Sequence, residues 1–383
     1  MAPITTDKKN LRQLYFALPI LRGLLAKRSG HEDDPYSRVI IYSASQAAPL
    51  KRSSSDGVPP LRLKAWEANA SVAVVRDQFR AAIDQFNAQY GRMPTRIMPA
   101  KGSLFYIAPR ARGNKQTLRN KIAVVTGAAG AIGAGICRSL LEHGYHVAAT
   151  DLIRESLDDL VKELKTLAPG RIIGVQMDVT DKKSVTIGFS QVTCRWGGVD
   201  IIVANAGIAM VAPLMDLDPG AFRKLEKVNI EGTLLTLAEA GRCLCRQNTG
   251  GDIILVSTKN VFSPGAQFGA YSATKAASHQ LARIASLEYA QFDIRVNMVA
   301  PDAVFSDGKR KSGLWAEIGP SRMKARGLDE KGLEEYYRNR NLLKARVTAA
   351  HVANAVLFFA TRQTPTTGAT IPVDGGLPDA TPR

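Results

Sequence analysis

The chain has 383 residues, of which 45% are hydrophobic, and a formal net charge of +17. This length suits a full α/β domain with an appendage. No apolar run reaches the roughly 18 residues that a membrane-spanning helix needs, so we do not expect a membrane protein. The five His and four Cys residues show no metal-binding spacing, so we predict no metal site, and we expect reduced cysteines in a cytoplasmic protein.

The positive charge is concentrated at the start of the chain. Residues 1–115 hold 19 Lys and Arg against 8 Asp and Glu. Such a surface attracts anionic partners, but no nucleic-acid-binding motif accompanies it, and aromatic residues do not alternate with the basic ones. We therefore expect a solvated or partner-facing basic surface rather than a nucleic-acid site.

Residues 1–115 predict a small basic α+β appendage without a catalytic constellation. Apolar spacing predicts helices at Leu11–Leu25 and Val72–Tyr90, and Gly91 ends the second. A membrane anchor or transit peptide is the alternative for the first helix. The acidic group around Asp33 and Asp34 is interpreted as a hydrated loop. The other expected segments are strands at Arg38–Tyr42, Thr95–Met98 and Leu104–Ile107, a loop at Ser43–Pro60 and a linker at Ala108–Gln116.

The stretch Lys121–Asp151 has the pattern of a dinucleotide-binding βαβ unit, with a strand, a glycine-rich turn, a helix and a second strand. Gly127 allows the turn a positive φ, Gly130 lets the backbone approach a pyrophosphate, and Gly133 lets the helix pack near the strand. A structural strand–helix turn is the alternative. The cofactor-binding residues predicted in this turn are Gly127, Gly130, Ala131, Ile132 and Gly133.

The second strand of this unit ends on an acid, Asp151, which follows Gly133 by 18 residues. A carboxylate here can accept both hydroxyls of an adenosine ribose and repels a 2′-phosphate. The sequence therefore favours NAD over NADP as cofactor, although the nearby Arg154 weakens that preference.

From Leu118 onward strands and helices alternate, which predicts an α/β domain over residues 116–383 with a Rossmann-type, doubly wound parallel sheet of about seven strands. Asp178 and Val179 end the third strand, where an acid can hold the adenine amino group. Small residues after the fourth strand let a cofactor cross the sheet edge; these are Asn205, Ala206 and Gly207. The expected strands are Ile122–Val125, Tyr145–Ala149, Arg171–Met177, Asp200–Ala204, Asp252–Val256, Ile294–Val299 and Ala369–Pro372.

Tyr271 and Lys275 lie four residues apart and so share one face of a predicted helix, Phe268–Tyr289. An ammonium beside a phenol favours the phenolate, so we expect a lowered pKa for Tyr271 and a role as general acid/base. Thr258 or Ser257, at the end of the neighbouring strand, can hold the substrate oxygen. A solvated helix pair is the alternative interpretation of the Tyr–Lys spacing.

Together these motifs, with Asn229 and the terminal Val373-Asp374-Gly375-Gly376, resemble the short-chain dehydrogenase/reductase family over residues from about 118 to 383. The resemblance implies nicotinamide-dependent hydride transfer at a carbinol carbon. It makes Tyr271 the acid/base, has Lys275 bind the nicotinamide ribose, and has Asn229 hold a water in a proton relay. Thr258 stands at the family's serine position, and both Tyr271 and Lys275 belong to the cofactor site as well.

The chain departs from the family pattern at two positions. Ala131 stands where the usual glycine turn has a third glycine, and Asp302 replaces the glycine after Pro301, a predicted cofactor-binding residue. Lys259 and Asn260 either face the pocket, where they suit an anionic or polyhydroxylated substrate, or cap the strand.

Residues 302–343 correspond to the substrate loop of the family. Its basic and aromatic side chains suit a sugar or phosphorylated sugar, with a solvated helical hairpin used in subunit packing as the alternative. They are Lys309, Arg310, Lys311, Trp315, Arg322, Tyr336, Tyr337 and Arg340.

This loop and the C-terminal tail also resemble a narrower group, the dehydrogenase half of bifunctional aldolase/short-chain dehydrogenases. These are proteins of the rhamnulose-phosphate aldolase/alcohol dehydrogenase type. Residues 1–115 hold no counterpart of the aldolase histidines, so no aldolase activity is predicted, and the segment is interpreted as a possible remnant of the junction. The family implies a homo-oligomer formed through two long helices, Pro219–Gln247 and Phe268–Tyr289. The leading prediction is an NAD-dependent oxidoreductase of small polyols, sugars or hydroxyaldehydes; the alternative is a catalytically silent dinucleotide-binding protein.

Overall fold

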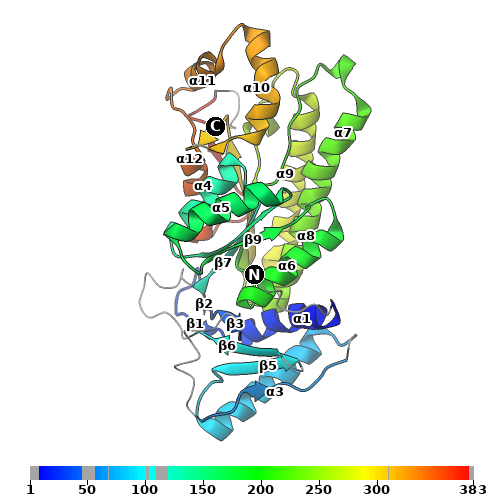
Figure 1. The fold of residues 1–383 in the computed structure, drawn as a ribbon, viewed down its shortest axis with the longest axis vertical. Helices are drawn as coiled ribbons and strands as arrows, with labels where there is room; N and C mark the ends of the chain where they lie inside the picture. The colour runs from blue at the N-terminus through cyan, green and yellow to red at the C-terminus, as the bar shows by residue number, and fades with distance from the viewer. Residues whose placement is uncertain are drawn as a thin grey trace.

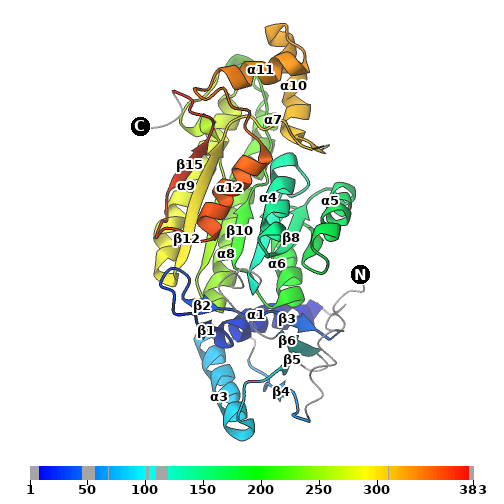
Figure 2. The same cartoon turned by 90° about the vertical axis from the view of Figure 1, so that its left-hand side faces the viewer.

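The computed structural model describes residues 8–44, 57–67, 69–100, 103–108, 120–308 and 310–378. Its centre is a seven-stranded sheet in the order β15-β12-β11-β10-β7-β8-β9, with all neighbours parallel (Figures 1 and 2). The strands are β7 Ile122–Thr126, β8 His146–Asp151, β9 Ile172–Gln176, β10 Ile201–Ala204, β11 Gly251–Val256, β12 Ile294–Pro301 and β15 Thr370–Val373. The predicted doubly wound sheet is therefore confirmed.

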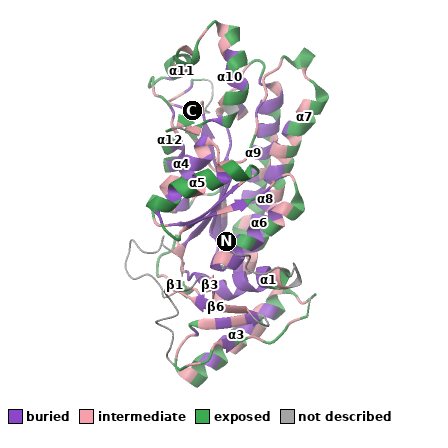
Figure 3. Ribbon diagram, viewed as in Figure 1, coloured by how far each residue is buried: buried purple, intermediate pink, exposed green. Residues whose placement is uncertain are grey.

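Helices cover both faces of this sheet, which explains why its strands are apolar without alternation. One face packs on α4 Ala131–Glu142, α5 Arg154–Leu167 and α12 Ala349–Ala360, and the other on α6 Lys182–Trp196, α8 Gly232–Gln247 and α9 Gly269–Tyr289. Every residue of β7, β10 and β11 is buried, as Figure 3 shows for the centre of the molecule. The strand order changes direction between β7 and β10, and parallel sheets bind ligands at the carboxyl side of such a point.

The predicted helix Pro219–Gln247 consists of three parts. An α-helix, α7 Pro219–Leu225, passes through one stretch of π-helix, η4 Glu226–Glu231, into α8. Asn229 lies inside the π-helical turn and is buried. Such turns often occur at functional sites, and this one re-aims a single side chain within a long helix.

The substrate-loop segment adds a small hairpin and two helices over the carboxyl edge of the sheet (Figure 1). They are β13 Ser306–Asp307, β14 Arg310–Lys311, α10 Gly313–Arg326 and α11 Glu330–Asn339. Single turns of 3₁₀-helix occur elsewhere at η3 Leu214–Asp216, η5 Lys259–Val261 and η6 Ala290–Phe292.

The described residues between 8 and 108 form a separate layer at the opposite end of the molecule (Figure 1). A four-stranded sheet, in the order β3-β6-β5-β4, carries one helix, α3, while α1 lies between this layer and the Rossmann helices α6 and α8. On α3 the predicted apolar face, Val75, Phe79, Ile83 and Phe86, is buried, and Gly91 ends the helix at φ 67°. The elements are α1 Lys8–Leu24, β1 Lys27–Arg28, β2 Tyr36–Ser37, β3 Ile41–Ser43, β4 Leu61–Arg62, α3 Val72–Tyr90, β5 Arg96–Ala100 and β6 Ser103–Ile107.

A buried ionic network joins this layer to the sheet. All five N–H groups of Arg22 donate, two of them to the carboxylate of Asp200 at 2.7 and 2.8 Å. Arg38 reaches both Asp200, at 3.0 Å, and Asp34, at 2.8 Å, and Lys121 pairs with Asp34 at 2.9 Å. The interpretation of Asp34 as part of a hydrated loop is therefore wrong, because its carboxylate holds the two layers together.

The expected strand Arg38–Tyr42 is also only partly right. Strand β3 begins at Ile41, and Arg38 stands between β2 and β3, where its side chain reaches into the ionic network. The spacing missed the short strands β1 and β4. Most of the expected loop Ser43–Pro60 and nearly all of the expected linker Ala108–Gln116 lie outside the described residues. Among the helices that the structure describes, none is both long and apolar enough to cross a bilayer.

Candidate active site

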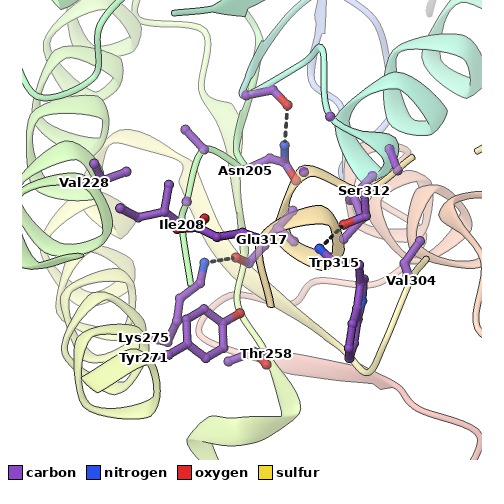
Figure 4. A pocket seen from close by; sticks show the side chains of 18 of the residues that line it. Asn205, Ile208, Val228, Thr258, Tyr271, Lys275, Val304, Ser312, Trp315 and Glu317 are labelled. Carbon is purple, nitrogen blue, oxygen red and sulfur yellow. Dashed lines mark hydrogen bonds between the residues drawn. The ribbon is translucent and has the colours of Figure 1, made fainter. Parts of the chain in front are cut away.

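A cavity of about 700 Å³ opens at the carboxyl edge of the sheet. All the predicted cofactor-binding residues line it, together with Thr258, Tyr271 and Lys275. Figure 4 shows Asn205, Thr258, Tyr271 and Lys275 around this space, with Ser312 and Trp315 of the substrate-loop segment on its other side. Residues separated by more than 170 positions in the chain thus meet where the strand order reverses.

The glycine turn between β7 and α4 has the backbone that its residues predict. Gly127 has φ 60°, and a Cβ on Gly133 would stand 2.4 Å from the Gly127 carbonyl oxygen and 2.7 Å from the Ala128 Cα. Gly130 differs, because a Cβ there meets nothing closer than 3.6 Å. Within the protein alone Gly130 is therefore under no steric demand, and its small size leaves room for a ligand over the N-terminus of α4.

Asn205 fixes this turn from the end of β10. Its side-chain amide donates to the carbonyl oxygens of Thr126 and Gly127, at 2.9 Å each. The Thr126 hydroxyl accepts from the backbone N–H groups of Asn205 and Ala206 at 3.0 Å. These four bonds hold two neighbouring strand ends in register, so Asn205 positions the turn.

Asp151 is at the end of β8, where the sequence placed it. Its carboxylate accepts from the N–H of Ala129 in the glycine turn at 2.9 Å and from the N–H of Ile153 at 3.3 Å. Both contacts orient the carboxylate along the cavity wall. Arg154 does not line the cavity, and its guanidinium pairs with Asp158 one helical turn away at 2.7 Å.

The cavity wall just after β8 contains two residues that the sequence did not predict. Leu152 and Ile153 line it although they are 57% and 55% exposed. Exposed apolar side chains beside a cavity are suited to a flat aromatic ligand, and their position directly after the acid at the end of β8 could have indicated them. On the opposite wall Asp178 accepts from the Thr180 N–H and hydroxyl with a single oxygen, Oδ1, at 2.8 Å each.

Tyr271 and Lys275 occupy the inner end of the cavity on α9, and both are buried. Burial raises the pKa of the Tyr271 phenol to about 12, while a hydrogen bond from the Thr258 hydroxyl works in the opposite direction. Burial lowers the pKa of Lys275 to about 8, and its ammonium donates to the Val256 carbonyl at 3.0 Å (Figure 4). The expected lowered pKa of Tyr271 is thus wrong for this structure, because desolvation by burial outweighs the hydrogen bond with Thr258.

The choice between Ser257 and Thr258 is decided by hydrogen bonds. The Ser257 hydroxyl is bonded to the His279 ring at 2.9 Å. The Thr258 hydroxyl accepts from the Asn260 N–H at 3.3 Å and faces the Tyr271 phenol. Thr258 is therefore the hydroxyl available next to Tyr271.

Asn229 does not line the cavity. Its side chain bonds both backbone groups of Ile208 at 2.9 Å and donates to the Thr274 hydroxyl at 3.0 Å. These bonds tie the segment after β10 to α9 at the residue before Lys275. The predicted water held by Asn229 stays a prediction; the contacts present make it a positioning residue.

The substrate-loop segment encloses the cavity on the side of Tyr271. Ile318 of α10 packs with Phe268 and Tyr271, and Trp315 stacks on Phe305 with ring centroids 4.5 Å apart. After Pro301, the Asp302 carboxylate forms an ion pair with Arg340, so this departure from the family pattern has a partner of its own.

The predicted loop residues divide into two groups. Trp315, Arg322, Tyr337 and Arg340 line the cavity. By contrast, Arg310 binds the Ala129 carbonyl and Glu163, Lys311 pairs with Glu330, and Tyr336 is exposed. Lys309 lies outside the described residues.

Comparison with known proteins agrees with this arrangement. Residues 121–317 match the family model described as "short chain dehydrogenase". The chain belongs to this family. Its members transfer hydride at CH–OH groups with a nicotinamide dinucleotide, so this short-chain dehydrogenase is an NAD(P)-dependent oxidoreductase. All of the first 120 residues lie outside the matched region.

Three similar proteins place the dehydrogenase within the family. It is 36% identical over 265 residues to the uncharacterized oxidoreductase YuxG of Bacillus subtilis, a match that covers 69% of this chain and 38% of YuxG. It is 37% identical over 204 residues to cis-4-hydroxycyclohexanecarboxylate dehydrogenase of Sinomonas cyclohexanicum, covering 53% and 80%. The structure of sorbitol-6-phosphate 2-dehydrogenase SrlD from Erwinia amylovora superposes with a TM-score of 0.61 at 28% identity, covering 66% and 98%.

Proposed function

We propose that this short-chain dehydrogenase prefers NAD and acts on a small polyol, sugar or hydroxyaldehyde, with Tyr271 as its general acid/base. One observation carries the proposal: Tyr271, Lys275 and Thr258 line the same cavity as the glycine turn and Asp151. A substrate carbon beside the phenol is then also beside the reactive end of a dinucleotide that lies along the strand ends.

The chain's own residues would handle the proton while the cofactor handles the hydride. A bound nicotinamide supplies the hydride acceptor or donor. Tyr271 removes the hydroxyl proton during oxidation and returns it during reduction, and Thr258 holds the substrate oxygen beside the phenol. Lys275 is protonated below about pH 8, where its ammonium favours the phenolate as it forms and can bind the nicotinamide ribose.

The preference for NAD rests on Asp151. The described geometry fits an adenosine ribose, because the carboxylate is fixed beside the glycine turn by the Ala129 N–H. Arg154, three residues after Asp151, is paired with Asp158 instead of facing the cavity. A carboxylate at the position of Asp151 discriminates against NADP because it repels a 2′-phosphate.

The substrate class is supported by the relatives and by the cavity. Two of the proteins above act, by name, on a hydroxylated carboxylate and on a sugar-alcohol phosphate. The cavity combines aromatic rings with several cationic groups at its substrate end. Both facts favour a small hydroxylated compound over a large apolar one.

We also infer a relation to the dehydrogenase half of bifunctional aldolase/short-chain dehydrogenases. In support, the similarity to YuxG covers only 38% of that protein, as expected for one part of a two-part chain. A cytoplasmic homo-oligomer without aldolase activity remains our proposal for this chain, with residues 1–115 as the appendage and 116–383 as the dehydrogenase domain.

A thermal-shift titration with NAD, NADH, NADP and NADPH tests the cofactor. A ligand that binds only the folded state adds about 2.7 kcal/mol at a hundredfold excess over its dissociation constant. We expect larger shifts with NAD and NADH than with the phosphorylated forms. Larger shifts with NADP or NADPH would contradict the role of Asp151, and no shift with any of the four would contradict the cofactor site itself.

The variant Tyr271→Phe tests the mechanism. The ring and its packing against Phe268 are kept, so cofactor shifts should persist, while turnover should fall about 10²- to 10⁴-fold because the proton donor is gone. Tyr289→Phe is the matched control, since it removes a phenol from the same helix where the hydroxyl only bonds the Leu237 carbonyl. Unchanged turnover in Tyr271→Phe would refute the assigned acid/base.

A further inference from the structure

Arg322 is a buried cation at the substrate end of the cavity. It belongs to α10, lines the cavity and is 7% exposed. Its guanidinium carbon lies 4.9 Å from the centre of the Phe268 ring, and one Nη faces the Tyr337 hydroxyl at 3.5 Å. Its Nε is buried without a hydrogen-bond partner.

Within the described part of the chain, no carboxylate lies within ion-pair distance of Arg322. Removing a guanidinium from water without a counter-ion is costly, so buried arginines are normally paired. Arg22 in the same protein shows the usual solution, with all five N–H groups bonded and Asp200 as counter-ion. Arg322, by contrast, has a charged guanidinium with unused N–H donors beside a cavity.

Two further cations from other elements line this end of the cavity. Lys259, just after β11, donates to the Ser263 carbonyl at 3.0 Å, and Arg340, just after α11, stacks over the Tyr337 ring at 4.1 Å. Burial first, and then the charges of Arg340 and Arg322, lower the pKa of Lys259. The three positive groups are therefore close enough to repel one another.

The nearby carboxylates do not neutralise Arg322. Asp302 is paired with Arg340. Asp374 accepts the Gly376 N–H with one oxygen and acts on Lys259, and its other oxygen is buried without a partner. Glu317, on the same helix as Arg322, lines the cavity but is exposed. Among the residues that the structure describes, Arg322 therefore has no carboxylate as an ion-pair partner.

The guanidinium of Arg322 lies close enough to Tyr271 for one small substrate to contact both. The Phe268 ring bridges the two groups, since its centroid lies 6.2 Å from that of Tyr271 and 4.9 Å from the Arg322 guanidinium. A molecule with its carbinol carbon at Tyr271 can therefore reach Arg322 with its far end.

We propose that Arg322, assisted by Lys259, binds an anionic group at the far end of the substrate, so that the enzyme acts on hydroxylated carboxylates or phosphate esters in preference to neutral alcohols. A guanidinium binds either group through two parallel hydrogen bonds, and the buried position strengthens them. The proposal rests on the proposed dehydrogenase function and names the substrate class of that same site.

The turnover test compares neutral and anionic members of two series. The three-carbon series is glycerol, glycerate and glycerol 3-phosphate, and the six-carbon series is sorbitol, gluconate and sorbitol 6-phosphate. In each series we expect a higher kcat/KM for one of the anionic members than for the neutral alcohol. Whether that member is the carboxylate or the phosphate ester identifies the anionic group that the site prefers. Arg322→Gln should lower kcat/KM of that member about 10- to 150-fold, the value of one lost charged hydrogen-bonding partner, and leave the neutral parent nearly unchanged.

Lys324→Gln is the matched control, because it removes one exposed positive charge from the same helix, outside the cavity. It should behave as the wild type. Lys259→Gln, on a different element, should lower the preference for the anionic substrate to a smaller degree. This second variant tests the proposal even if Arg322→Gln fails to fold. Equal losses for neutral and anionic members, or a wild-type preference for the neutral ones, would overturn the proposal.

A binding measurement separates this proposal from the proposed function. Inorganic phosphate and acetate, added in the presence of NADH, should raise the melting temperature of wild type and Lys324→Gln more than that of Arg322→Gln. If no alcohol is oxidised but this difference is present, the dehydrogenase function fails and the anion site stands. Equal shifts in all three proteins would overturn the anion site, whether or not alcohols are oxidised.

Discussion

At the scale of single residues, burial sets the acidity of the proposed catalytic pair, Tyr271 and Lys275. Four residues on a helix place Tyr271 and Lys275 on one face, and the structure brings both to the cavity. Their protonation depends instead on burial, which disfavours both charged forms and moves the two pKa values to about 12 and about 8. At neutral pH the phenol is therefore protonated, as the reduction of a carbonyl requires.

The buried ammonium of Lys275 should cost stability. Its folded-state pKa of about 8 is below the ordinary 10.5, so the unfolded chain binds more protons between these values and stability rises with pH across that window. Lys275→Met removes the buried charge and should gain about 1–3 kcal/mol at pH 7, after the loss of the bond to the Val256 carbonyl. Urea unfolding at pH 7 and at about pH 9.5 should show this gain shrink by about 2 kcal/mol, because wild-type stability rises over the roughly 1.5 pH units above the folded-state pKa.

An equal gain in the free energy of unfolding at both pH values would mean that burial does not lower the pKa of Lys275 in the folded state. Lys227→Met provides a control, since this residue lines the same cavity but is exposed, so its charge has little burial to oppose it. The activity of Lys275→Met should be lost in either case, because stability and function make opposite demands on this residue.

At the scale of elements, two positions of the glycine turn, Gly130 and Gly133, require a small residue for different physical reasons. Gly133 is required by the fold, because a Cβ would press on the backbone of Gly127 and Ala128 at 2.4 and 2.7 Å. Gly130 meets no such contact. The same residue type in one motif therefore serves packing at one position and, in our proposal, close approach of the pyrophosphate at the other.

Two alanine variants separate these roles. Gly133→Ala should destabilise the protein by about 1–3 kcal/mol, because overpacked backbone has to shift. Gly130→Ala should leave the melting temperature without cofactor nearly unchanged but weaken NADH binding at least tenfold. Thermal melts and a fluorescence titration with NADH measure both. Undiminished NADH affinity in Gly130→Ala would place the pyrophosphate elsewhere.

At the scale of the whole molecule, the N-terminal layer is joined to the dehydrogenase domain by buried charge rather than by a surface contact. Arg22 and Asp200 stand 178 residues apart, and the same carboxylate also accepts the N–H of Ile122 at the start of β7. Burial would raise the Asp200 pKa, but Arg22 and Arg38 outweigh it and lower it. This contribution to stability is present above the ordinary aspartate pKa and is lost as the pH falls below it.

Arg22→Met should therefore weaken both layers at once. Breaking a buried ion pair leaves Asp200 without its main partner and costs about 3–5 kcal/mol. We expect one cooperative transition at a lower denaturant concentration. Arg12→Met, on the exposed side of the same helix, should change stability by no more than about 0.5 kcal/mol. Two separate transitions, with the dehydrogenase part unaffected, would show that the layers fold independently.

The proposed homo-oligomer has a matching surface on adjacent helices. Leu234 of α8, and Ile284 and Leu287 of α9, are exposed, Leu287 by 79%. Apolar side chains gathered on neighbouring helices favour a covered interface. Leu287→Asp should reduce the assembly measured by light scattering at micromolar concentration, while Leu214→Asp, an equally exposed site on η3, should not. A wild-type monomer would contradict this expectation.

The sequence by itself determined the order of strands and helices from Ile122 onward, the glycine turn, Asp151 and the Tyr271–Lys275 pair. Each of these depends on neighbours within about thirty residues, so hydrophobic period and motif spacing contain the information. The tertiary structure alone decided what depends on contacts between distant segments: the Asp34 and Asp200 network, the choice of Thr258 over Ser257, and the position of Arg322 beside Phe268. Burial, which sets the pKa values at the site, arises only when those segments meet.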